Sequence, residues 1–306
     1  MRVLVLGAGV NGLSAGVILA EAGYDVHLLA RELPLETTSA VAAAIWYPYL
    51  AEPRQRVLAW AQISFAAFVA LADNPDSGVV MRPGNELLRG YTDDPWWACV
   101  VADLTRMDHV PSPYRSGWSF TTPVIDMPVY LRWLQRRLEA AGGTLTRMAL
   151  GGLPDRAGLV VNCSGLGARL LATDDTLYPV RGQVVRVDQV GVDRWVLDGS
   201  EPTYVVPRSN DIIVGGTDTE RQWDRRPDAE VAERIMARAT VLVPALADAR
   251  VLGHRVGLRP ARPSVRLEIE QRGAHPVIHC YGHGGAGVTT SWGCAEEVLA
   301  LAKALS

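Results

Sequence analysis

Cysteines, clustered basic residues and long apolar runs are all scarce in this sequence. The 306 residues include four cysteines, Cys99, Cys163, Cys280 and Cys294, which are widely spaced and form no CxxC pair. The sequence therefore predicts neither a disulfide framework nor a metal site. The formal net charge is −3 and no block of Lys and Arg occurs, so we expect no nucleic acid and no membrane among the partners.

Segments that would direct the chain out of the cytoplasm are also lacking. No stretch approaches the ~18 consecutive apolar residues that indicate a membrane span. The first apolar run, Met1 to Leu6, leads directly into a glycine-rich turn, without the charged region and cleavage site of a signal peptide. We therefore predict a cytoplasmic protein whose partners are small molecules. The sequence leaves the oligomeric state open, with a homodimer as one alternative.

What the sequence does contain is an ordinary globular composition, with 48% hydrophobic and 21% charged residues. Residues 2–6 are typical of a buried strand, and apolar residues recur at helical spacing from Val10 until Gly23. Residues 25–29 then form a second strand-like run. Strand, glycine turn, helix and strand within about thirty residues are the context of a dinucleotide-binding fold.

The rest of the chain predicts a second region inserted into the first. Residues 51–143 carry scattered tryptophans among Pro-rich loops, with one helical run over 128–141. Strand-like runs return later, the last two forming a hairpin, and a helix ends the chain; these elements are 159–161, 184–187, 204–206, 212–214 and 292–304.

The glycine turn, Gly7-Ala8-Gly9-Val10-Asn11-Gly12, fits the pattern GxGxxG. The first glycine permits a tight turn, the second lets the backbone approach a pyrophosphate, and the third permits close packing of helix and strand. The helix N-terminus would present unpaired N–H groups and its positive dipole to the phosphates. A turn without a ligand is the alternative, but the position after an N-terminal strand favours a dinucleotide.

The residue that would bind the adenosine ribose is not evident. A carboxylate is expected at the end of the second strand, where the sequence has Ala30, followed by Arg31 and Glu32. An arginine there suits the 2′-phosphate of NADP, whereas Glu32 could bind the ribose from further along the chain. The glycine turn alone leaves FAD and nicotinamide nucleotides as alternatives.

Eight motifs in one order, spread over nearly the whole chain, resemble the D-amino-acid oxidase family, which includes D-aspartate oxidase. They are the glycine turn, Ala30-Arg-Glu-Leu-Pro34, Thr37-Thr-Ser39 with Val41-Ala-Ala-Ala-Ile-Trp-Tyr-Pro-Tyr49, Val161-Asn-Cys-Ser-Gly-Leu-Gly167, Val180-Arg-Gly-Gln183, Pro202-Thr-Tyr-Val-Val-Pro207, Gly257-Leu-Arg-Pro-Ala-Arg-Pro263 and Tyr281-Gly-His-Gly-Gly-Ala-Gly-Val-Thr289. Any one would be a weak signal. The second resembles the fungal members, which makes the missing acid at Ala30 compatible with FAD and leaves NADP the weaker alternative.

The resemblance implies an α/β fold with noncovalent FAD. A Rossmann-like FAD-binding domain would comprise residues 1–50, 142–184 and 253–306, and a mainly antiparallel substrate-binding domain would comprise residues 51–141 and 185–252. The FAD-binding residues would be Gly7, Gly9, Val10, Asn11, Gly12, Arg31, Thr37, Thr38, Ser39, Ala43, Ala44, Ile45, Met148, Ser164, Gly165, Gly282, Gly284, Gly285, Gly287, Val288 and Thr289.

Three of these segments have a physical reason to contact FAD. Hydroxyls of residues 37–39 can donate to pyrophosphate oxygens, with an ordinary capping cluster as the alternative. The small residues 42–45 would let the flat flavin ring lie against backbone. Amides of residues 282–289, before the last helix, can stabilise negative charge on the reduced flavin, with a turn that has no ligand as the alternative.

For the substrate the sequence points to Arg259, because the planar guanidinium matches the carboxylate of an amino acid. The resemblance implies catalytic and substrate-binding roles for Arg259, for Tyr204 as the substrate-facing tyrosine, and for a backbone carbonyl near Gly285 that contacts the amine. Arg262 and Arg266 are expected in structural ion pairs.

The implied reaction is hydride transfer from the Cα of a neutral or basic D-amino acid to flavin N5. Oxygen then reoxidises the flavin to give hydrogen peroxide, and water converts the imino acid to a 2-oxo acid and ammonia. Positioning can accomplish the hydride transfer without a protein base. His283 therefore has two interpretations, a residue beside the reaction or a structural histidine next to the flavin.

Two departures from the family leave the side-chain pocket open. Asp218 stands where fungal members have a second active-site tyrosine, and Ser200 stands where vertebrate members have a lid tyrosine. A carboxylate at 218 would repel acidic substrates and attract basic ones. The alternative is a solvated aspartate paired with a neighbouring arginine, Arg221, Arg225 or Arg226.

Three rival functions remain at this point. The first is D-aspartate or glycine oxidation on the same fold. The second is a flavoprotein dehydrogenase that does not use oxygen. The third is a nonenzymatic dinucleotide-binding regulator, in which Arg259 with Tyr204 would have no evident purpose.

Overall fold

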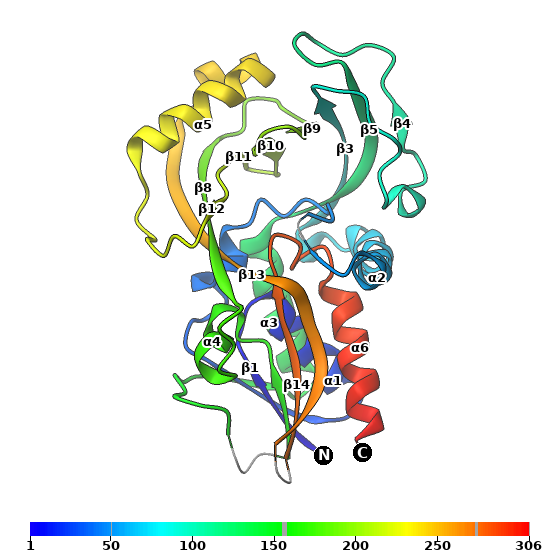
Figure 1. The fold of residues 1–306 in the computed structure, drawn as a ribbon, viewed down its shortest axis with the longest axis vertical. Coiled ribbons are helices and arrows are strands. Elements are labelled where there is room, and N and C mark those ends of the chain that lie inside the picture. The colour runs from blue at the N-terminus through cyan, green and yellow to red at the C-terminus, as the bar shows by residue number, and fades with distance from the viewer. Residues whose placement is uncertain (50, 155–157, 273–274, 306) are drawn as a thin grey trace.

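The computed structural model describes residues 1–49, 51–154, 158–272 and 275–305. The strands form one 14-stranded sheet in the order β4-β5-β3-β9-β10-β11-β8-β13-β14-β7-β1-β2-β6, with β12 (Thr219–Glu220) paired with β8. Figure 1 shows two lobes, with β8 (Tyr178–Asp188) and β13 (Val251–Arg272) running from one lobe into the other. The N- and C-termini lie at the same end of the molecule (Figure 1).

The lobe that holds both termini is built on a parallel sheet. Its strands are β1 (Arg2–Leu6), β2 (Asp25–Ala30), β6 (Thr144–Arg147), β7 (Leu159–Asn162) and β14 (His275–His283). Val3 and Val5 in β1 have no exposed surface, as expected of a parallel strand covered on both faces. The predicted strand, glycine turn, helix and strand are confirmed, with α1 (Val10–Glu21) as the helix.

The other lobe is mainly antiparallel. The predicted hairpin is confirmed, because β10 (Thr203–Pro207) pairs antiparallel with β11 (Asp211–Gly215). α5 (Ala229–Leu242) packs on this sheet around Ile235, which is fully buried. The remaining strands are β3 (Val79–Leu88), β4 (Thr105–Arg106), β5 (Ser116–Ile125) and β9 (Trp195–Asp198).

Two helices from the predicted insertion pack on the parallel lobe. α2 (Arg54–Ala72) packs on α6 (Ser291–Ala304), and α3 (Met127–Ala140) packs on α1. The predicted substrate-binding segment 51–141 therefore contributes core to the half that carries the glycine turn. The contact with α6 is close, because the Ser64 hydroxyl accepts hydrogen bonds from two amides of α6, at 3.1 and 3.0 Å.

α2 was not predicted, although its sequence is strongly apolar. Within the described residues it is the one helix that is long and apolar enough to cross a membrane by length and composition, with a mean hydropathy of 1.3. Its buried positions Val57, Trp60, Ser64 and Phe68 recur every three or four residues and form the stripe that joins the core. The remaining helical elements are α4 (Ala168–Leu171) and short 3₁₀ turns at Pro34–Glu36, Thr38–Val41, Pro75–Ser77, Ala98–Val100, Gly165–Gly167 and Pro244–Asp248.

Candidate active site

A cavity of about 1020 Å³ is lined by residues of both lobes. It extends from the glycine turn to the ends of β10 and β13. Of the predicted FAD-binding and substrate-binding residues, all line this cavity except Gly12 and Gly282. The structure thus brings segments from both ends of the chain to one site.

The glycine turn is shaped by close backbone contacts. A Cβ at Gly7 would lie 2.5 Å from the carbonyl oxygen of Cys163, and one at Gly12 would lie 2.0 Å from the carbonyl oxygen of Gly7. Gly12 therefore permits packing rather than lining the cavity. Gly282, with φ of +84°, also lies outside the lining, because this position faces the Arg262 side chain.

The start of α1 offers free hydrogen-bonding groups to a ligand. Its N-cap, Gly9, supplies no side-chain cap. The Oδ1 atom of Asn11 is buried without a hydrogen-bond partner among the described residues. Buried polar atoms are normally paired, so an orphaned acceptor in the lining of a cavity fits a ligand with hydroxyl groups, as a dinucleotide has.

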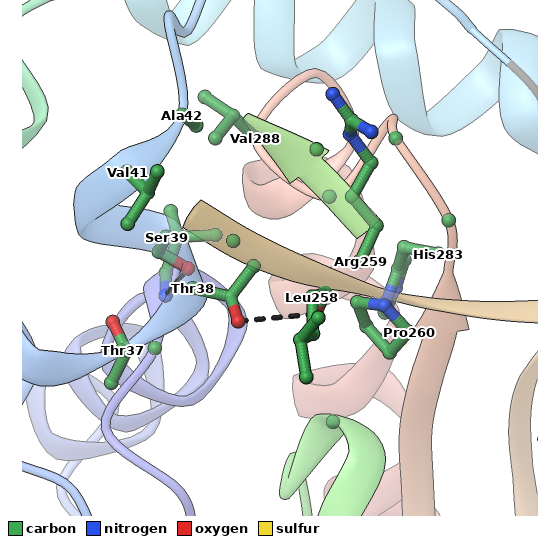
Figure 2. Close-up of a pocket in the computed structure, with 18 of the residues that line it drawn as sticks. Thr37, Thr38, Ser39, Val41, Ala42, Leu258, Arg259, Pro260, His283 and Val288 are labelled. Atoms are coloured by element: carbon green, nitrogen blue, oxygen red, sulfur yellow. Dashed lines mark hydrogen bonds between the residues drawn. The ribbon is translucent and has the colours of Figure 1, made fainter. Parts of the chain in front are cut away.

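The three hydroxyls at 37–39 are not equivalent. Thr37 donates to the carbonyl of Pro34 at 2.7 Å, and Thr38 donates to the carbonyl of Leu258 at 3.1 Å, as Figure 2 shows for Thr38. The Ser39 hydroxyl instead accepts from the N–H of Val10 at 3.0 Å. We expected all three to donate to a pyrophosphate. Only the Ser39 hydroxyl is still available as a hydrogen-bond donor, because Thr37 and Thr38 already donate to backbone carbonyls.

Small residues line the middle of the cavity as predicted. Ala43 and Ala44 are 8% and 7% exposed, and Ala44 has a φ of +53°, which brings its backbone into an unusual conformation beside the cavity. Across the cavity, Gly284 has a φ of +54° and donates its N–H to the carbonyl of Pro260 at 2.9 Å. A flat ring fits between such surfaces.

Of the two residues considered for the adenosine end, Glu32 is already engaged. It accepts from Arg225, which follows β12, at 2.8 Å, and from Arg31 at 3.3 Å. The ion pair with Arg225 connects the two lobes at the mouth of the cavity. Arg31 and Met148 also line the cavity, and Glu32 could bind a ligand only by giving up its ion pair with Arg225.

At the opposite end of the cavity, the side chains of Arg259 and Tyr204 occupy positions that are open only because Gly182 and Gly215 lack a Cβ. A Cβ at Gly182 would lie 2.5 Å from Nη1 of Arg259, and a Cβ at Gly215 would lie 2.1 Å from Cζ of Tyr204. Arg259 donates to the carbonyl of Thr217 at 2.9 Å, and Figure 2 shows its side chain pointing away from the Thr37–Ser39 turn and from His283. Burial raises the pKa of Tyr204 and the nearby guanidinium opposes this, so the phenol is neutral at neutral pH.

The neighbouring arginines are held in ion pairs, as predicted. Arg262 donates to Asp174 at 2.9 Å, and Arg266 donates to Glu270 at 2.9 Å. Among these three arginines on β13, Arg259 is the one that lines the cavity without a carboxylate partner in the described structure. It is therefore the arginine that a substrate carboxylate can reach.

Asp218 lies at the exposed rim of the cavity rather than deep inside it. It accepts from the hydroxyl of Tyr49 at 3.4 Å. The predicted alternative of an arginine partner is wrong, because the three candidates have other contacts: Arg225 binds Glu32, Arg226 binds Asp224, and Arg221 lies over the ring of Tyr178.

Tyr49 is a site residue that the sequence analysis quoted without giving it a role. A Cβ at Gly285 would lie 2.7 Å from Cδ1 of its ring, so this tyrosine packs against the turn before α6. Burial first, and then the charge of Asp218, raise the pKa of Tyr49, while Arg259 lowers it. The contacts of Tyr49 with Gly285 and Asp218 join segments that are far apart in the sequence, so they depend on the tertiary structure.

His283 is engaged with sulfur rather than with the substrate end. Its Nε2 atom lies 3.5 Å from Sγ of Cys294 and 3.9 Å from Sγ of Cys280. The side chain is 2% exposed. Of the two interpretations of His283, the structural one fits this geometry.

Known proteins are similar to this chain over nearly its whole length. The model of the FAD dependent oxidoreductase (DAO) family matches residues 2–301. A D-amino-acid oxidase of Rubrobacter xylanophilus is 50% identical and is covered over 96% of its length by 99% of this chain. A D-amino-acid oxidase of Streptomyces coelicolor is 44% identical, and the match covers 99% of this chain and 97% of that protein. The solved structure of glycine oxidase from Geobacillus kaustophilus has the same fold, with a TM-score of 0.84, 21% identity, and 99% of this chain and 95% of that chain covered.

Proposed function

This chain belongs to the FAD dependent oxidoreductase (DAO) family, and on that premise we propose that it oxidises D-amino acids to imino acids with oxygen as electron acceptor. The observation that supports the activity is the unpaired guanidinium of Arg259 beside Tyr204 at the end of the cavity. The names of the relatives support D stereochemistry. When bound, FAD supplies the two-electron acceptor that takes the Cα hydride and returns the electrons to oxygen as hydrogen peroxide.

The residues of the chain would bind and orient the substrate. Arg259 would form a two-pronged, charge-assisted contact with the carboxylate, and the neutral hydroxyl of Tyr204 would donate a further hydrogen bond. The carbonyl near Gly285 would accept from the amine. With both ends of the Cα fixed, positioning provides most of the rate advantage, and no side chain has to remove a proton from carbon.

We propose that the preferred substrates are neutral or basic D-amino acids. Asp218 lies at the exposed rim with only a long hydrogen bond from Tyr49, so its charge can act on a substrate side chain that reaches the rim. Solvent weakens this effect, which therefore grades substrates rather than excluding them.

An anaerobic titration of the yellow holoenzyme tests the activity. D-alanine, D-valine and D-lysine should bleach the flavin absorbance, whereas the L-isomers should leave it unchanged. Admission of air should restore the colour and release one hydrogen peroxide per 2-oxo acid. A flavin that no D-amino acid bleaches would contradict the proposal, and bleaching without peroxide in air would favour a dehydrogenase.

We further propose noncovalent FAD, a cytoplasmic location and small-molecule partners, with a homodimer as one possible assembly. The flavin should be released completely into the supernatant by acid precipitation. Colour that remains with the precipitate would contradict noncovalent binding, which is a real test here because Cys163, Cys280 and His283 all line the cavity.

A further inference from the structure

Two of the four cysteines, Cys280 and Cys294, converge on His283 beside the large cavity. Cys280 and His283 lie at the end of β14, Cys294 lies in the first turns of α6, and Cys163 follows β7. The ligand atoms of Cys280, His283 and Cys294 all lie within 4.8 Å of one another. Cys280 is 1% exposed, His283 2% and Cys294 0%.

The spacing of these atoms matches a tetrahedral metal site. With Zn–S bonds of about 2.3 Å and Zn–N bonds of about 2.0–2.1 Å, tetrahedral angles place sulfur about 3.5 Å from nitrogen. The two S···N distances are 3.5 Å for Cys294 and 3.9 Å for Cys280. The Cys294–His283 distance fits this geometry, and the Cys280–His283 distance is slightly longer than it.

The ligands are chemically suited to a soft or borderline cation. Two thiolates and a neutral imidazole around a divalent ion give a cluster with no net charge, which is the form that a buried site favours. Without an ion, the hydrogen bonds of His283 among the described residues go only to sulfur, which is a weak partner.

The site also has an entry path. Cys163, Cys280 and His283 line the large cavity, so an ion can arrive from there before the cofactor occupies it. The remaining cysteine, Cys99, is exposed and lies apart from this group.

We propose that Cys280, His283 and Cys294 bind one Zn²⁺ ion. Each thiol that binds as thiolate releases its proton to water, so uptake is favoured as pH rises. The ion would have a structural role, because its three ligands join the end of β14 to the first turns of α6.

The test is the metal content of the holoenzyme. Wild type and variants are purified from cells grown with added zinc sulfate, passed over a chelating resin, and analysed for zinc and FAD per chain. We expect stoichiometric zinc in wild type and in Cys99→Ala, the matched removal of a cysteine outside the cluster. Cys294→Ala should hold almost none while keeping its FAD.

A second measurement covers the case in which Cys294→Ala fails to fold. Cadmium added to the wild-type full chain before FAD should produce the ultraviolet sulfur-to-cadmium charge-transfer absorption. The same signal should appear in Cys99→Ala, and zinc should raise the melting temperature of both by several degrees. Wild type without zinc and without this absorption, or Cys294→Ala with undiminished zinc, would overturn the proposal.

Discussion

The parallel and antiparallel lobes contribute to the site in different ways. The parallel lobe offers backbone groups and small residues, held by contacts such as the one between Gly12 and the carbonyl of Gly7. The antiparallel lobe and the strand β13 offer long side chains, Tyr204 and Arg259, which need glycines opposite them. The difference suggests that cofactor binding and substrate binding can be damaged separately.

Removal of the Arg259 guanidinium should have the largest effect. Arg259→Ala should lower kcat/KM by about 3–5 kcal/mol of transition-state stabilisation, because the substrate carboxylate would be left buried and unpaired. FAD binding should be unchanged. Arg262→Ala is the matched control, since Arg262 lies on the same strand but pairs with Asp174. Steady-state kinetics within about threefold of wild type for Arg259→Ala would end the assignment.

Gly12→Ala tests the parallel lobe. The added Cβ would lie 2.0 Å from the Gly7 carbonyl oxygen, so the turn must open, at a cost of about 3 kcal/mol. We expect weaker FAD binding in a fluorescence titration, with kcat per bound FAD close to wild type. Gly16→Ala, one turn further along α1, meets the ends of the Leu28 and Leu138 side chains rather than backbone and serves as the control. Equal FAD affinity in the two variants would refute the packing role of Gly12.

Asp174 should show a structural effect without a catalytic one. Contacts with Thr176, Tyr281 and Arg262 hold its pKa at about 2 despite burial. A lowered pKa stabilises the fold above the ordinary value of 3.8, and this stabilisation is lost as pH falls towards 2. Asp174→Asn should thus cost about 2 kcal/mol at pH 7 and less at pH 3. Denaturant unfolding at both pH values checks this, and a cost that grows at pH 3 would contradict it.

The smallest expected effect belongs to Asp218, which is exposed and therefore screened. Asp218→Asn should raise kcat/KM for D-aspartate relative to D-lysine by about 1 kcal/mol or fivefold, with D-alanine as neutral reference. Lower salt should enlarge the effect. An unchanged D-lysine to D-aspartate ratio, or D-aspartate as the best wild-type substrate, would show that the charge at the rim does not select substrates.

Most of the fold was predictable wherever the apolar pattern was regular. α1, β2, the β10–β11 hairpin and α6 follow the predicted segments closely. α2 and α5 were missed, and so were the strands β3, β5, β13 and β14. In α2 the exposed face itself carries alanines, Ile63 and Val69, so the buried stripe has little contrast along the sequence. The domain division is still a prediction, although α2 and α3 pack on the parallel lobe rather than with the substrate-binding residues.

The sequence predicted which residues line the cavity where the type of side chain suits a ligand and a motif identifies the position. Arg259, Tyr204 and the glycine turn are of this kind. Tyr49 was not, because its contacts with Gly285 and Asp218 join segments far apart in the chain. The Cys280–His283–Cys294 cluster was not predicted either, because the widely spaced cysteines indicated no metal site, although Cys280 and His283 lie only three positions apart.

By itself, the sequence determined the first two strands and the helix between them, the β10–β11 hairpin and the glycine turn, because periodicity and glycine content are local properties. Only the tertiary structure decided which hydroxyl at 37–39 remains available as a donor, which cavity arginine of β13 has no carboxylate partner among the described residues, and which thiols lie close to His283. Those outcomes depend on what lies across the cavity. Strand pairing between β13 and β8 fixes the place of Arg259, and the packing of α6 against β14 brings Cys294 to His283.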